Sequence, residues 1–70
     1  MKNLIKLERA RNNITQADLA DKVKVSRQTI NSIETGRFIP SALLAFKIAH
    51  VLQKPVDEVF QLEESDWYTL

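Results

Sequence analysis

The chain has no cysteine and a single glycine among its 70 residues. Without cysteine there is no disulfide, no thiolate nucleophile and no cysteine-based metal site, which suits a reducing cytoplasm. One glycine is too few for a glycine-rich phosphate-binding loop. The single histidine, His50, has no neighbouring ligands with which to hold a metal. We therefore predict no metal and no cofactor, and we interpret His50 as a surface or interface residue.

Long apolar segments are missing as well. The longest unbroken apolar run covers residues 42–46, whereas a membrane-spanning helix needs about 20 residues. Residues 1–7 lack the apolar stretch of a signal peptide. Seventy residues make one domain with a small core, which a tight helical fold or a dimer would help to stabilise. We expect a cytoplasmic protein that has no membrane partner.

Catalytic groupings are also lacking. No nucleophile and base occur in a pattern typical of covalent catalysis. The acidic residues near the C-terminus are more consistent with a solvated face than with an acid–base pair. These residues are Asp57, Glu58, Glu63, Glu64 and Asp66. We therefore predict that the protein is not an enzyme.

The formal net charge of +1 hides an asymmetry. Residues 1–40 carry eight lysines and arginines against four acids, a balance of +4, while residues 41–70 carry two against five, a balance of −3. A basic half of this kind is what binding to phosphates requires, although charge alone is weak evidence because many surfaces are uneven.

Two short amphipathic helices are predicted within the basic half, at residues 16–23 and 27–35. Thr15 is expected to cap the first helix, with Asp18 three residues later, and Ser26 is expected to cap the second. Gly36 follows the second helix, where a left-handed residue is needed. Two helices this close together predict a helix-turn-helix.

The two faces of this unit differ in character. The apolar positions face the partner helix and the core, and Ala20 is small enough for a close helix crossing. These positions are Leu19, Val23, Val25, Ile30 and Ile33. The outer face of the second helix carries Arg27, Gln28, Asn31, Ser32 and Thr35. Such a helix fits the major groove of DNA; the alternative is a polar face that is merely solvated.

The rest of the chain predicts three further helices. The first covers residues 3–12 and ends at Asn13 in a left-handed conformation. A fourth helix follows Ser41 as its cap and carries a clear apolar stripe. A short fifth helix is expected at residues 56–60, where Val59 and Phe60 would close the core. No strand pattern is found before the tail.

The order of these elements and several motifs resemble the phage repressor and Cro family, also called the xenobiotic response element (XRE) family. The matching motifs are I-T-Q at 14–16, V-S-R-Q-T-I at 25–30, I-E-T-G-R at 33–37, P-S at 40–41, K-I-A at 47–49 and D-E-V-F at 57–60. The match covers residues 3–62, and in length the chain is most similar to small stand-alone members, which have no ligand-binding domain. It implies an all-α, lambda-repressor-like fold of five helices with the helix-turn-helix at helices 2 and 3.

The resemblance further implies a DNA-binding domain at residues 1–62, with a tail at 63–70 that can include a short strand. Members of the family regulate transcription by binding double-stranded DNA as homodimers, most often as repressors. Three positions depart from the pattern. Lys24 and Asn13 stand where the family usually has glycine, and strain is expected at Lys24 if its φ is positive. Glu8 stands where an aliphatic core residue is common, beside apolar Leu7.

Three side chains are predicted to read bases. The fork of Arg27 can donate to both O6 and N7 of guanine, with a phosphate contact as the alternative. Gln28 lies where the family faces bases and can pair with adenine. Ser32 lies one turn further on, and either touches a base edge or a thymine methyl or only makes room.

Phosphate contacts are predicted on both sides of the second helix of the motif. They comprise Gln16, Ser26, Thr29, Asn31, Thr35, Arg37 and the backbone N–H of Phe38. A solvated loop charge is the alternative for Arg37. The resemblance also implies a structural ion pair between Arg9 and Glu34.

The tail is unusually apolar for a solvated segment, which predicts a homodimer interface. The interface residues expected are Phe60, Leu62, Trp67, Tyr68 and Leu70. The alternative is that these residues fold back over Leu4 and Leu7 of their own chain. Two other functions are alternatives: an antitoxin-like or accessory module with an unidentified protein partner and secondary DNA binding, and a nonspecific nucleic-acid coat. The short tail argues against the first, and the weak net charge argues against the second.

Overall fold

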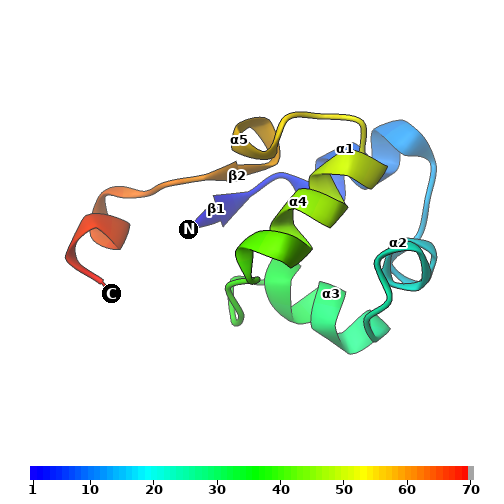
Figure 1. Cartoon of the computed structure of the whole chain (residues 1–70), viewed down its shortest axis with the longest axis horizontal. Coiled ribbons are helices and arrows are strands. Elements are labelled where there is room, and N and C mark those ends of the chain that lie inside the picture. Colours follow the sequence, from blue (N-terminus) through cyan, green and yellow to red (C-terminus); the bar gives the residue numbers. More distant parts are fainter. Residues whose placement is uncertain (70) are drawn as a thin grey trace.

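Short helices carry most of the chain in the computed structural model, which describes residues 1–69 (Figure 1). Within those residues two short strands pair antiparallel, with Lys2 opposite Gln61 and Asn3 opposite Phe60. The elements in chain order are β1 Lys2–Asn3, α1 Ile5–Asn12, α2 Gln16–Val23, α3 Arg27–Glu34, α4 Ala42–Val51, α5 Val56–Val59, β2 Phe60–Gln61 and the 3₁₀ helix η1 Glu64–Tyr68. The predicted all-α fold of five helices is confirmed in its helices, and the short antiparallel pair of strands is added to it.

The core lies where α2, α3 and α4 meet α1 and α5. Its members are apolar side chains that repeat at helical spacing and are almost completely shielded from solvent. They are Ile5, Leu19, Ala20, Val23, Ile30, Ile33, Ala45, Ile48, Ala49, Leu52, Val59 and Phe60. The predicted inward positions of both motif helices are therefore buried, except that Val25, in the turn between them, is only half-buried.

The N-terminus differs from the helix predicted at residues 3–12. The side chain of Asn3 accepts a hydrogen bond from the Ile5 N–H at 3.3 Å, and the Leu4 N–H donates to Val59 O at 2.8 Å. The backbone of residues 2–3 is thereby committed to β2, so α1 begins at Ile5. The expectation that no strand precedes the tail is wrong for the same reason.

Glu8 and Leu7 on α1 do not follow the usual apolar pattern. Glu8 is buried, with one carboxylate oxygen accepting from Arg11 at 3.0 Å; its other oxygen has no hydrogen-bond partner among the described residues. Leu7, beside it, is 46% exposed. The helix therefore turns its carboxylate inward and leaves a leucine on the surface.

The helix ends follow the predicted capping chemistry. Thr15 and Asp18 form a reciprocal capping box on α2, and Ser26 caps α3 by accepting from the Thr29 N–H. Asn13 and Lys24 both have a positive φ, of 56° and 66°. A lysine there carries a steric cost of about 1–2 kcal/mol.

The C-terminal segment leaves the helical body (Figure 1). A short C-terminal strand is present, but it lies at Phe60–Gln61, before residues 63–70 in which it was expected, and α5 therefore ends at Val59, one residue before its predicted end. Beyond it η1 is held by Asp66, which accepts from the Glu63 N–H at 2.7 Å and from the Met1 amine at 3.0 Å. Trp67 and Tyr68 remain 74% and 84% exposed.

The alternative in which the tail folds back over Leu4 and Leu7 does not describe this arrangement, because its aromatic rings stay in solvent. Phe60, by contrast, is only 8% exposed and belongs to the core of its own chain. Leu70, also expected at an interface, lies outside the described residues.

Candidate nucleic-acid interface

The second helix of the motif, α3, packs its apolar face against the core and exposes its polar face to solvent. Ile30 and Ile33 are buried in the core, whereas Arg27 and Gln28 at the start of the helix are exposed. Ser32 is half-buried one turn further on. The chain thus brings the three predicted base-reading residues to the outer surface of one rigid helix, as reading of base edges requires.

A hydrogen-bond network joins α2 to this face. The Gln16 side chain accepts from Arg27 at 3.1 Å through its oxygen and donates to Asn31 and Glu34, each at 3.2 Å, through its nitrogen. One amide therefore connects the start of α2 with both ends of α3. Because the Arg27 guanidinium has five N–H donors and Gln16 takes one of them, the others remain available for a ligand.

The network continues into an ion pair beneath the helix. Arg9 donates to Glu34 through Nε at 2.7 Å and through a terminal nitrogen at 3.2 Å. Its other terminal nitrogen donates to Ile14 O at 3.1 Å. Both side chains are largely shielded, with 14% of Arg9 and 6% of Glu34 exposed. A bidentate pair with so little solvent contact holds α1, the start of α2 and the end of α3 in one geometry.

Asn3 is a further anchor that the sequence pattern did not reveal. Its side-chain nitrogen donates to Ile33 O at 2.9 Å, close to the C-terminal end of α3. This residue was assigned to the first helix, and its polar contact spans 30 positions of sequence. No local signal could have identified the contact, because it depends on the pairing of β1 with β2.

A shallow hollow of about 380 Å³ lies beside the base-reading positions. It is lined by Ser26, Gln28, Thr29, Ser32, Arg37 and Phe38. The hollow thus brings four of the predicted phosphate-binding residues together with two of the predicted base-reading residues. A neutral, hydroxyl-rich surface with an arginine at its edge is suited to a nucleic-acid backbone.

Some predicted phosphate donors already have partners within the chain. The Phe38 N–H donates to Ser32 O at 3.2 Å, and the Thr35 hydroxyl donates to Asn31 O at 2.9 Å. The Ser26 and Thr29 hydroxyl oxygens lie 3.0 Å apart and share one hydrogen bond. These groups would contact a phosphate only by sharing or exchanging these bonds, whereas the Arg37 side chain is exposed and has no such internal partner among the hydrogen bonds of residues 1–69.

The cap at the start of α2 contains a carboxylate, Asp18, whose pKa is lowered by its hydrogen bonds. The Thr15 N–H, and then its hydroxyl, hold the pKa of Asp18 below its ordinary value. The carboxylate therefore keeps its charge to a lower pH than a free aspartate does, and it fixes the start of α2 next to Gln16. Its side chain takes part in the cap and leaves the α3 face free.

Other kinds of site find little support. Among residues 1–69 no three histidines or carboxylates gather as metal ligands. Within the same residues no helix has both the length and the apolar character needed to cross a membrane. His50 lies exposed on α4.

The sequence of the chain is similar to a family of known proteins. Residues 5–59 match the helix-turn-helix family. The chain is 48% identical over 66 residues to an uncharacterized HTH-type transcriptional regulator of Methanocaldococcus jannaschii, an alignment that covers 94% of this chain and all of the relative. It is 44% identical to another from Bacillus subtilis, again covering 94% of this chain and all of the relative. A third, from Archaeoglobus fulgidus, is 41% identical, covering 94% of this chain and 93% of the relative.

The match spans the capped pair α2 and α3 and the helices that support it, and the relatives are similar along nearly their whole length. The chain belongs to the XRE-type family of helix-turn-helix transcriptional regulators.

Proposed function

We propose that the protein is a sequence-specific repressor of transcription that binds a two-fold-symmetric operator as a cytoplasmic homodimer. The observation that carries this proposal is the α3 face, where Arg27 and Gln28 point outward from a helix that Gln16, Glu34 and Arg9 hold in place. A guanidinium and an amide at the start of a rigid helix are the groups best suited to guanine and adenine edges.

In this proposal, Arg27 and Gln28 provide most of the base discrimination and Ser32 contacts a base edge or a thymine methyl. The backbone on either side is held by residues that carry no sequence information. They are Gln16, Ser26, Thr29, Asn31, Thr35, Arg37 and Phe38. The charge balance of +4 over residues 1–40 supports attraction to phosphates.

The geometry of DNA supports the proposed homodimer. One recognition helix covers only a few base pairs, and two such helices about 34 Å apart would reach successive major grooves on one face of the duplex. The residues proposed for the interface are those of the tail, 63–70, together with Leu62, which is 64% exposed. Bound to its operator, the dimer would block polymerase by occupancy.

Selection of duplexes from a random pool tests the proposal. Wild-type protein should enrich a palindromic site, and an Arg27→Ala, Gln28→Ala double variant that keeps its helical circular dichroism should not. The salt dependence of binding distinguishes the remaining outcome: a nonspecific binder would lose nearly all affinity with salt and enrich no site.

A further inference from the structure

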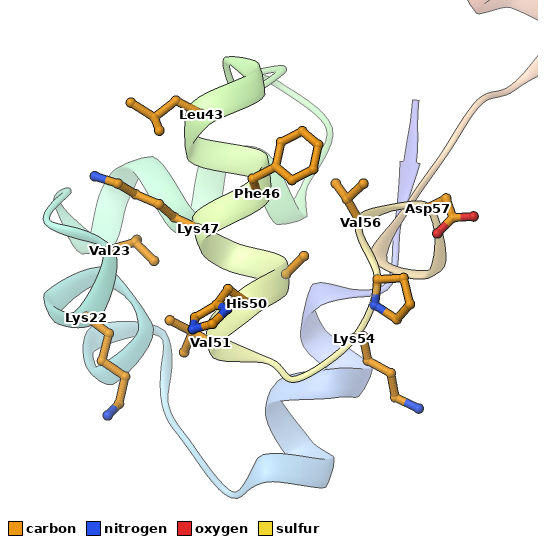
Figure 2. A pocket seen from close by; sticks show the side chains of 12 residues that line it. Lys22, Val23, Leu43, Phe46, Lys47, His50, Val51, Lys54, Val56 and Asp57 are labelled. Atoms are coloured by element: carbon orange, nitrogen blue, oxygen red, sulfur yellow. The ribbon is translucent and has the colours of Figure 1, made fainter.

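An apolar hollow of about 760 Å³ lies between the outer face of α4, the end of α2 and the start of α5 (Figure 2). Leu43 and Phe46 of α4 are 68% and 62% exposed there. Figure 2 shows Phe46 on α4 facing Val56, the first residue of α5, on the other side of the hollow. Exposed apolar side chains that line one concave surface indicate a binding partner.

The rim of this hollow is basic. Lys22, Lys47 and Lys54 line it against one acid, Asp57, among the described residues around it. Figure 2 places Lys22 and Lys54 on opposite sides of the hollow. A phosphate backbone would satisfy the lysines but would leave the leucine and phenylalanine exposed. The occupant that fits is a segment with acidic and large apolar side chains together.

The tail of the same protein has this composition. Leu62, Trp67 and Tyr68 are all at least 64% exposed. Three acids lie between them in the sequence: Glu64 is exposed, and Glu63 and Asp66 pair with the Met1 amine of their own chain. The tail leaves the helical body at β2, and its end projects away from α4 (Figure 1). In this conformation it does not cover the hollow of its own chain, so a second copy is the natural recipient.

We propose that the acidic, aromatic tail of each chain seats in the α4 hollow of a second copy, so that a two-fold dimer contains two identical tail-to-hollow contacts. The proposal rests on the homodimer proposed above and names the surface that receives the tail. Reciprocal exchange satisfies the self-complementarity that a two-fold interface requires. Opposite charges at the rim add specificity to the apolar contact.

Another hollow, of about 480 Å³, is the alternative recipient of the tail. It lies over Leu4, Leu7 and Ala10 and has one lysine, Lys6, and one acid, Glu34, in its lining. With no excess of positive charge it gives an acidic tail no electrostatic advantage. The charge of the tail therefore favours the α4 hollow.

A charge exchange tests the proposal on the full chain. One variant carries Lys22→Glu and Lys47→Glu. The other carries Glu64→Lys and Ser65→Lys, because Glu63 and Asp66 are paired with the Met1 amine of their own chain. Each variant alone sets like charges against one another in both contacts, so we expect its dimer dissociation constant to rise roughly tenfold or more. Mixed in equal amounts, the two variants should form a heterodimer in which both contacts again join opposite charges. Native mass spectrometry separates the three species by mass.

The proposal is overturned if either variant alone dimerises as tightly as wild type, or if the folded variants stay monomeric when mixed. Phe46→Ser and Leu7→Ser form a matched pair that does not depend on charge, since both replace an exposed apolar side chain. We expect Phe46→Ser to weaken the dimer and Leu7→Ser to leave it unchanged. The reverse result would move the tail to the hollow over Leu4. Wild-type protein that is monomeric at micromolar concentration would contradict the homodimer itself, and not only this contact.

Discussion

The helical body of the protein and its tail differ in how far their side chains are buried and hydrogen-bonded. In the body, Arg9, Glu34 and Gln16 form one connected hydrogen-bond network, and the apolar side chains of α2 and α3 are buried. In the tail, Trp67 and Tyr68 lie in solvent. The contrast teaches that the hydrogen-bond network and the core of the body are satisfied within a single chain, whereas the aromatic side chains of the tail are not. Changes to the network or the core should therefore alter folding stability, and changes to the tail or to the α4 hollow proposed to receive it should alter assembly.

Removal of the tail should give the largest effect on assembly. A chain truncated after Glu63 keeps the β1–β2 pairing but loses Trp67 and Tyr68, so we expect it to be a monomer with much weaker operator binding. Sedimentation equilibrium measures its mass, and circular dichroism establishes that it remains folded. A truncated protein that still sediments as a dimer would show that the body alone carries the interface.

Loss of the ion pair should give the largest effect on stability. Arg9→Ala leaves Glu34 shielded without its main partner, and we expect a loss of about 3 kcal/mol in the free energy of unfolding. Urea denaturation measures this change, with Lys6→Ala as the control because that side chain is exposed on the same helix. An unchanged midpoint for Arg9→Ala would refute a stabilising role for the pair.

Replacement of Lys24, in the turn of the helix-turn-helix, should raise the stability of the protein, whereas loss of the ion pair lowers it. Lys24 has a φ of 66°, so Lys24→Gly should stabilise the protein by roughly 1 kcal/mol. Lys6→Gly makes the same chemical change within α1, away from the α4 hollow, and should destabilise by about 1 kcal/mol. Thermal melting of both variants checks the contrast in sign. If both variants melt below wild type, the strain at Lys24 is negligible.

The smallest effect is expected from the cap on α2. Since the folded state lowers the pKa of Asp18, its charge adds stability that is fully present above its ordinary pKa of about 3.9 and is lost as the pH falls through the lower, folded value. The difference in melting temperature between wild type and Asp18→Asn should therefore shrink below pH 4. Asp21→Asn, exposed on the same helix, serves as the control. A difference that stays constant with pH would exclude a charged cap.

The sequence predicted what depends on neighbouring residues. Thr15 with Asp18, and Ser26 with Gly36, are local signals for helix ends, and they placed α2 and α3 within one residue of their observed bounds. Contacts between distant residues were not predictable in this way. Asn3 pairs with Phe60 and donates to Ile33, and these contacts convert the expected start of a helix into a strand.

In the candidate site, too, features set by neighbouring residues were predictable from the sequence, whereas contacts between distant residues were not. Exposure of Arg27 and Gln28 follows from helical periodicity once Ile30 and Ile33 face the core. The role of Gln16 as the link between Arg27, Asn31 and Glu34 does not follow, since it requires the crossing of α2 and α3 in space. The exposed tail was apparent from composition, but the basic hollow on α4 combines residues from three elements and has no signature in sequence.

The most direct test of the account asks whether Arg27 contacts a guanine, as proposed. In the selected operator, each guanine of a half-site is replaced in turn by 7-deazaguanine, which lacks the N7 acceptor, and binding of wild type and Arg27→Ala is compared. At one position we predict that wild type loses about 1–3 kcal/mol of binding free energy, while Arg27→Ala loses almost nothing further. Equal losses for both proteins at every guanine would contradict base reading by Arg27.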